Sequence, residues 1–146
     1  MIAVIMLWSA SAAAGAQDNY RVQCHDIMTA DILDMHNVVQ DGLGFIWISS
    51  SDGLYRYDGY RMQDFRPKAS DGTGVSSYDV KQMQTDSDGN IWSIIDSKPI
   101  KLDIRTYRFK NIIKRLEARS RRSYRITDIM MGRQNRLYMI CDDSTV

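Results

Sequence analysis

The side chains of this sequence best suited to bind a ligand are the Lys and Arg residues that crowd one segment. Between Lys110 and Arg125 the only acidic residue is Glu117. Dense Lys and Arg bind phosphates or sulfated and carboxylated sugars, and Arg matches a carboxylate or sulfate with two parallel hydrogen bonds. The positive cluster consists of Lys110, Lys114, Arg115, Arg119, Arg121 and Arg122. We predict that Arg119, Arg121 and Arg122 bind an acidic ligand.

A second interpretation of the basic segment is a solvated loop that faces the Asp-rich part of the chain. Exposed charge runs usually contribute little binding energy, so this interpretation is the favoured one. The charge is unevenly distributed: residues 17–97 hold six Lys and Arg against 13 Asp, whereas residues 98–146 hold 13 Lys and Arg against five acids.

Other residues that could do chemistry have weaker support. Asp86-Ser87-Asp88-Gly89 resembles the start of a calcium loop, but no Glu closes it, so a plain turn is favoured. His25 and His36 lie in no metal or nucleophile motif, and Ser49-Ser50-Ser51 lacks the setting of a nucleophilic serine. The sequence therefore predicts no catalytic residue, no cofactor and no metal ligand.

The amino terminus has the pattern of a secretory signal peptide. Residues 1–16 carry no charge and end in Ala14-Gly15-Ala16, a cleavage pattern of small residues, although no Lys or Arg precedes the apolar run. A buried strand or helix is the alternative. Export would allow Cys24 and Cys141 to pair, but two separately buried thiols are favoured because nothing in the sequence brings them together.

The elements that must position these side chains are strands. Of the 18 acidic residues, 17 are Asp, which favours turns and disfavours helices. Asp41–Trp47 (DGLGFIW) matches Asp86–Trp92 (DSDGNIW) at an offset of 45, and Gly132–Tyr138 is a weaker third copy at 46. A period in the mid-forties is typical of propellers or arrays.

Each repeat has room for four short antiparallel strands. In the second copy the expected strands are 80–85, 91–95, 100–104 and 107–112, with turns at 86–90 and 96–99. Four such strands make one blade of a β-propeller. Trp47 and Trp92 are then expected in the core between blades.

The predicted fold class is therefore all-β, a partial β-propeller of two four-stranded blades and part of a third. The expected organisation is a signal peptide at 1–16, a lead-in at 17–36, blade 1 at 37–66, an exposed connection at 67–79, blade 2 at 80–112, a basic inter-blade segment at 113–125 and part of blade 3 at 126–146. Because propellers close with 4 to 8 blades, we expect this chain to be the amino-terminal piece of a longer protein. By itself the chain is expected to be marginally stable or self-associating.

The repeats resemble the two-component regulator propeller family. Gly89-Asn90-Ile91-Trp92 and Asp52-Gly53-Leu54-Tyr55-Arg56-Tyr57-Asp58 carry the resemblance, which covers residues 32–112. The first copy departs from the pattern at Leu43 and Phe45, and the second has Lys98-Pro99 in place of the Gly-Leu step. In that family the motif residues are scaffold, so the resemblance identifies no ligand-binding residue.

The resemblance implies a periplasmic sensor region of a hybrid histidine kinase. The expected function is to sense a ligand, an oligosaccharide, and the chain itself is not expected to be an enzyme. The implied partners are further propeller blades, the signalling modules of an inner-membrane parent protein and a second copy in a homodimer of that parent. Export would remove nucleic acid as a partner. The alternative function is a fragment of a secreted propeller enzyme or lectin that acts on polysaccharide.

Overall fold

The computed structural model describes residues 3–9, 20–26, 32 and 34–142. They belong to two units, residues 1–32 and 33–146. In the first unit, β1 (Ala3–Ser9) pairs antiparallel with β2 (Tyr20–Asp26), with Ala3 opposite Asp26 and Ser9 opposite Tyr20. The predicted signal peptide overlaps β1, but its remaining residues, including the cleavage pattern at 14–16, lie outside the described ones. The signal peptide stays a prediction.

The second unit begins with a four-stranded antiparallel sheet whose strands are joined in chain order. They are β3 (Met35–Gln40), β4 (Ile46–Ser50), β5 (Gly53–Tyr57) and β6 (Met62–Phe65). β4 has a partner strand on each side and is buried along its whole length. β3, at one edge of the sheet, alternates half-buried and exposed residues, as expected for a strand with one covered face.

A second sheet repeats this arrangement 45 residues later. It contains β7 (Val80–Thr85), β8 (Ile91–Ile95), β9 (Lys98–Asp103) and β10 (Arg108–Asn111), again in chain order. Two further strands, β11 (Arg125–Met131) and β12 (Leu137–Asp142), form a hairpin, which continues the repeat. The prediction of an all-β fold is confirmed. That the sheets are blades of a propeller remains a prediction.

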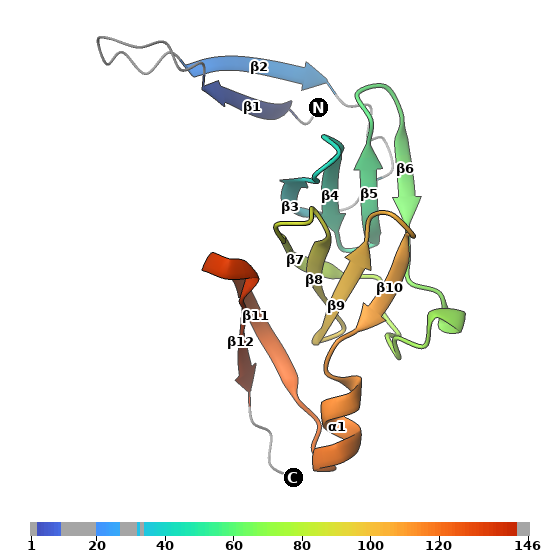
Figure 1. Cartoon of the computed structure of the whole chain (residues 1–146). Coiled ribbons are helices and arrows are strands. Elements are labelled where there is room, and N and C mark those ends of the chain that lie inside the picture. The colour runs from blue at the N-terminus through green and yellow to red at the C-terminus, as the bar shows by residue number, and fades with distance from the viewer. Residues whose placement is uncertain (1–2, 10–19, 27–31, 33, 143–146) are drawn as a thin grey trace. The chain divides into compact units, whose positions relative to one another are not determined.

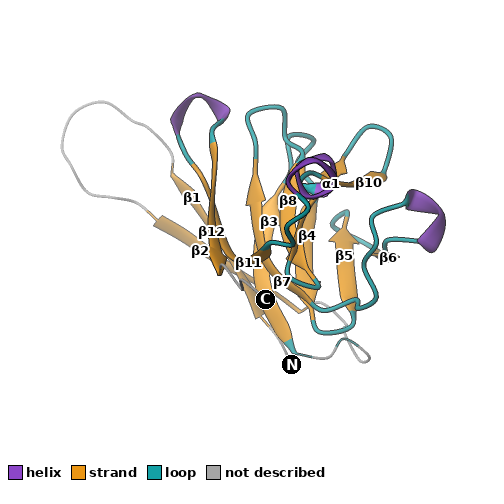
Figure 2. Cartoon of the chain, turned by 90° about the horizontal axis from the view of Figure 1, so that it is seen from below, coloured by secondary structure: helices purple, strands orange, loops and turns teal. Residues whose placement is uncertain are grey.

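The first strands of the three repeats lie next to one another. β7 packs against β3 on one side and against β11 on the other, as both views of the fold show (Figures 1 and 2). A short helix, α1 (Lys114–Ser120), connects β10 to β11, and single 3₁₀ turns lie at η1 (Ala69–Asp71) and η2 (Arg133–Asn135). The basic segment expected at 113–125 thus contains a short helix.

Two hydrophobic clusters lie on opposite sides of the second sheet. The larger one joins Trp47 and Leu54 of the first sheet to Ile91, Ile95 and other buried residues of the second. The smaller one joins Ile94 of β8 to Ile113, Ile126 and Ile129. β8 is thus covered on both faces, as its nearly continuous apolar sequence, interrupted only by Ser93, predicts. Trp47 is completely buried, as predicted, whereas Trp92 is only half-buried beside the smaller cluster.

The predicted turn at 96–99 is shorter in the structure. Only Asp96 and Ser97 turn the chain, both with positive φ (54° and 57°), and β9 already begins at Lys98. Two-residue hairpins favour such left-handed residues because their twist matches that of the strands. Pro99 fits inside β9 because it lies opposite Ile112, beyond the last residue of β10. The prediction that Pro99 belongs to the turn was therefore wrong.

Two further expectations differ from the structure. Cys141 is an exposed free thiol rather than a buried one, because it lies on β12, which among the described strands pairs only with β11. The side chain of Cys24 lies outside the described residues. The connection at 67–79, expected to be exposed, is partly fixed: Thr73 is buried and its carbonyl accepts a hydrogen bond from Asn111 Nδ2 at 3.1 Å.

Candidate functional site

Each Asp-Gly turn is held by one carboxylate. Asp86 accepts hydrogen bonds at Oδ1 from the backbone N–H groups of Asp88 (3.0 Å) and Asn90 (2.8 Å), and at Oδ2 from the indole Nε1 of Trp92 (3.0 Å). Lys101 Nζ lies 3.1 Å from the same Oδ2. Burial alone would raise the pKa of Asp86, but hydrogen bonds from Trp92 and Asn90 outweigh it and lower the pKa.

The first repeat contains the same arrangement. Asp41 accepts from the backbone N–H groups of Leu43 (2.8 Å) and Phe45 (3.0 Å), and from the indole Nε1 of Trp47 (2.7 Å). Asp41 and Asp86 are both buried, and their carboxylates are occupied within their own turns. They are scaffold residues, in agreement with the choice of a plain turn over a calcium loop. Among the described residues no group of three or more His, Cys, Asp or Glu side chains could hold a metal ion.

The third copy keeps the backbone of this turn and replaces its two side chains. The N–H of Gly132 donates to the carbonyl of Arg136 at 2.8 Å, as Asp41 N–H does to Phe45 and Asp86 N–H to Asn90 at 3.0 Å. A Cβ at Gly132 would lie only 2.5 Å from Cε2 of Tyr138, the residue in place of Trp. The Tyr138 ring occupies the space that a side chain at position 132 would need, so Gly in place of Asp and Tyr in place of Trp occur together in this turn.

The basic cluster predicted from the sequence is divided by the structure. Arg119 lies in α1, Arg121 is its left-handed carboxyl-terminal cap and Arg122 follows; all three are exposed, and α1 has no buried residue. Lys110, Lys114 and Arg115 lie at the other end of the segment, where they line a small cavity with Asp71. Ligand binding by Arg119, Arg121 and Arg122 remains a prediction.

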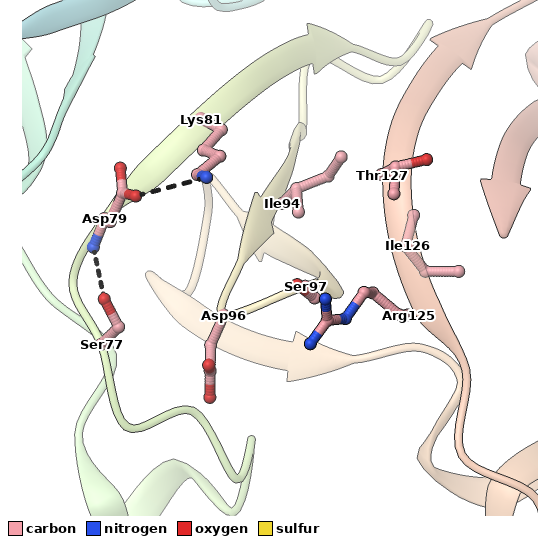
Figure 3. A pocket seen from close by; sticks show the side chains of 9 residues that line it. All are labelled: Ser77, Asp79, Lys81, Ile94, Asp96, Ser97, Arg125, Ile126 and Thr127. Atoms are coloured by element: carbon pink, nitrogen blue, oxygen red, sulfur yellow. Dashed lines mark hydrogen bonds and ion pairs between the residues drawn. The ribbon is translucent and has the colours of Figure 1, made fainter. Parts of the chain in front are cut away.

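A different pocket lies where the first strands of the second and third repeats begin. Its volume is about 370 Å³. β7, the β8–β9 hairpin and β11 contribute its walls, and the buried side chains of Ile94 and Ile126 supply its apolar surface (Figure 3). Its polar lining consists of Ser77, Asp79, Lys81, Asp96, Ser97, Arg125 and Thr127. We call this the β7–β11 pocket.

Asp79 joins the first two repeats at the edge of this pocket. Its Oδ1 lies 3.2 Å from Nε2 of His36 on β3, and its Oδ2 lies 3.8 Å from Nζ of Lys81 on β7. The backbone N–H of Asp79 donates to Ser77 Oγ at 3.1 Å. These contacts fix a carboxylate between two basic side chains.

Asp96 is fixed from three sides. Its Oδ2 accepts hydrogen bonds from Lys98 Nζ (2.9 Å) and from the backbone N–H (3.2 Å) and hydroxyl (3.0 Å) of Ser76. The bond from Lys98 is the main reason that the pKa of Asp96 is lowered, so the carboxylate is ionised at neutral pH. Both pocket carboxylates are therefore acceptors held in place by the fold.

Arg125 supplies the pocket with a cation of a different kind. Its guanidinium points toward the β8–β9 hairpin at Ser97 (Figure 3). Within the described part of the chain, none of the ion pairs involves Arg125. Its donors thus remain available to a ligand, because Arg carries five N–H groups in a planar fork.

Sequence reasoning missed this pocket, although one signal was present. His36 and Lys81 stand 45 residues apart, and Thr127 follows 46 residues after Lys81, so the three occupy equivalent places on β3, β7 and β11. All three are exposed beside a half-buried or buried neighbour. A polar residue kept at one exposed position of three adjacent strands indicates a surface lined by the repeats.

Comparisons with known proteins identify the fold. No family model and no curated protein matches the chain. Among solved structures, the chain resembles the extracellular domain of BT3049, assigned to a hybrid two component system of B. thetaiotaomicron, with a TM-score of 0.58 and 15% identity over 84% of this chain. The extracellular domain of BT4673, assigned to a one component system of the same organism, matches with a TM-score of 0.38 and 10% identity over 84% of this chain and 24% of that domain.

The match covers only part of the larger protein. This chain corresponds to 18% of the BT3049 domain, so about a fifth of its length is spanned. In the portion of this chain that the structure describes, none of the helices combines the length and apolar character needed to cross a membrane. The chain thus has the fold of a segment of the extracellular domain of BT3049.

Proposed function

We propose that this chain supplies two blades and part of a third to the extracellular propeller of a two-component sensor protein, and that the propeller binds a glycan. The observation that carries the proposal is the shared fold with the BT3049 domain. The repeated Asp–Trp turns at an offset of 45 support it, because the second of them contains Gly89-Asn90-Ile91-Trp92, through which the sequence resembles the two-component regulator propellers.

The order of the sheets also supports a propeller. Each repeat is a meander of strands in chain order, and the first strands, β3, β7 and β11, are the ones that pack on one another. Strands placed in this way are the inner strands of neighbouring blades, and further repeats would close a ring around them. Such a ring places the exposed side chains of His36, Lys81 and Thr127 toward its axis.

The β7–β11 pocket is the proposed ligand site. Its carboxylates can accept hydrogen bonds from sugar hydroxyls, and Lys81 and Arg125 can donate hydrogen bonds to those hydroxyls. Its apolar floor suits the C–H face of a sugar ring. The charges of Asp79, Asp96, Lys81 and Arg125 cancel. A neutral oligosaccharide fits this balance better than an acidic one.

The ligand is tested by calorimetric titration of the full chain with neutral oligosaccharides, namely gluco-, galacto-, manno- and arabino-oligosaccharides. Lys81→Ser with Arg125→Ser is expected to weaken binding of the recognised sugar by roughly tenfold or more, the loss of one or two hydrogen bonds to charged donors. The matched control is Arg119→Ser with Arg121→Ser, which removes the same charge from exposed positions outside the pocket. Equal losses in both variants, or no binding of any sugar, would reject the site.

The sensor role is tested separately. Fusion of alkaline phosphatase, which is active only after export, behind Val146 is expected to give active enzyme in the periplasm. The reading frame after Val146 is expected to encode further repeats, a membrane helix and a kinase core. A cytoplasmic, inactive fusion or a frame that leads into a hydrolase domain would reject the sensor role, whatever the sugar titrations give.

A further inference from the structure

The cavity beyond the end of β10 is a second polar site, separate from the β7–β11 pocket. Its volume is about 320 Å³, and it lies between the connection at residues 71–72 and the segment that leads from β10 into α1. Three of its lining residues, Lys110, Lys114 and Arg115, are cations, and one, Asp71, is an acid. The balance of charge is therefore positive, unlike that of the β7–β11 pocket.

The wall opposite the cations is held in place by the sheet. Lys114 Nζ donates a hydrogen bond to the carbonyl of Gly72 at 2.7 Å, and Asn111 Nδ2 donates to the carbonyl of Thr73 at 3.1 Å. Asn111 Oδ1 in turn accepts from the backbone N–H of Ile113 at 3.1 Å. One side chain of β10 thus fixes both the connection and the start of the helical segment, so the cavity has a defined shape.

The acid in the cavity is engaged in its own turn. Asp71 Oδ2 accepts a hydrogen bond from the backbone N–H of Lys68 at 2.8 Å. Of the ion pairs among the described residues, none includes Lys110, Lys114 or Arg115. Lys114 uses one of its three donors on Gly72, which leaves two, and Arg115 brings a planar fork.

We propose that Lys110, Lys114 and Arg115 form a binding site for an oxyanion group, a sulfate, phosphate or carboxylate carried by an acidic ligand. Three cations that take part in none of the ion pairs among the described residues line one cavity, and an oxyanion would supply acceptors for their remaining donors. Arg119, Arg121 and Arg122 carry the same charge but line neither of the two cavities described here. The proposal does not depend on the glycan proposed for the β7–β11 pocket.

The test compares two triple variants of the full chain. The cavity variant is Lys110→Ser, Lys114→Ser and Arg115→Ser; the control is Arg119→Ser, Arg121→Ser and Arg122→Ser, which removes the same number of charges from the same segment. Probes are inorganic sulfate, inorganic phosphate, a sulfated disaccharide, glucuronate and, as a neutral reference, glucose. Binding is followed by chemical-shift changes of backbone amides, with circular dichroism to establish that each variant is folded.

We expect sulfate to shift the amides of residues 110–115, and the affinity to fall roughly tenfold in the cavity variant and less than twofold in the control. The affinity should also fall with added salt, since exposed charges are screened over about 8 to 10 Å at physiological ionic strength. Tighter binding of the sulfated disaccharide or of glucuronate than of either inorganic ion would identify a sugar as the carrier. No shift at residues 110–115, or equal losses in the two variants, would overturn the proposal.

Discussion

The indole Nε1 of Trp92 donates a hydrogen bond to Asp86 at 3.0 Å, and Trp47 makes the same bond to Asp41 at 2.7 Å one repeat earlier. The first residue of each turn thereby fixes the side chain that enters the next strand. In this way a local turn sets which side of the strand carries the large aromatic residue, and hence which residues face the neighbouring sheet.

Removal of the Asp86 carboxylate is expected to destabilise the second sheet. Asp86→Ala leaves the donors of Trp92 and Asn90 without their acceptor, at a cost of roughly 3 kcal/mol in the free energy of unfolding. Asp88→Ala in the same turn is the control, because the Asp88 side chain is exposed and its backbone donor is kept. Urea titration measures both; a similar loss in the two variants would contradict the role assigned to Asp86.

Acid is expected to destabilise the fold through the same groups. Hydrogen bonds lower the pKa of Asp52 (from Ser50), Asp96 (from Lys98) and Asp103 (from the Thr106 backbone), and that of Asp86 against the effect of burial. A lowered pKa in the folded state gives stability that is present above the ordinary value of 3.8 and is lost as the pH falls below it.

The measurement is the urea midpoint between pH 6 and pH 2.5. The wild-type midpoint should stay level down to about pH 4 and then fall as these carboxylates take up protons. In Asp86→Asn the fall should be shallower, because one of the contributing groups no longer titrates. A midpoint that declines just as steeply in this variant would show that Asp86 does not contribute to acid sensitivity.

The two tryptophans separate burial from hydrogen bonding. Both donate to the Asp of their own turn, but Trp47 is completely buried and Trp92 half-buried. Trp47→Ala is expected to cost roughly 4 kcal/mol and Trp92→Ala about half of that, because the cavity left by a buried ring adds to the lost transfer energy. Thermal unfolding followed by circular dichroism ranks the variants. Equal losses would mean that the shared hydrogen bond, not burial, dominates.

The sequence predicted the features that depend on residues close together in the chain and missed those that depend on residues far apart. The turns at Asp41 and Asp86 and the strand at 91–95 depend on residues close in the chain, and their patterns identify them. The contact of His36 with Asp79 spans 43 residues, and β3 and β7 are each paired irregularly with the next strand of their own sheet, near Met35 and Val80. No pattern in one repeat predicts that contact.

The basic segment shows the same limit. Its charge is visible in the sequence, but the division of the six cations of the positive cluster between two places is not. Lys110, Lys114 and Arg115 line a cavity because Gly72 and Thr73, some 40 residues away, are hydrogen-bonded against the end of β10. The choice of Arg119, Arg121 and Arg122 was based on charge density alone, which says nothing of the opposing wall.

The close approach of two turns provides the last prediction. Gly89 and Gly44 occupy equivalent places in the second and first turns, and both have positive φ (79° and 90°). A Cβ at Gly89 would lie 2.5 Å from the backbone N of Gly42 in the neighbouring turn, whereas a Cβ at Gly44 would meet only Gln40 Nε2, at 3.9 Å. Gly89 therefore lies tightly against the backbone of the first turn, whereas Gly44 has room for a side chain.

Gly89→Ala should consequently cost more than Gly44→Ala. The left-handed conformation costs about 1 to 2 kcal/mol in either variant, and at Gly89 the turns must also move apart, since backbone atoms cannot give way as a flexible side chain does. We expect a further loss of roughly 1 to 3 kcal/mol for Gly89→Ala, measured by urea unfolding of both variants. Equal losses would mean that the two turns do not approach closely in solution, and the stacking of the first and second sheets at this end would have to be revised.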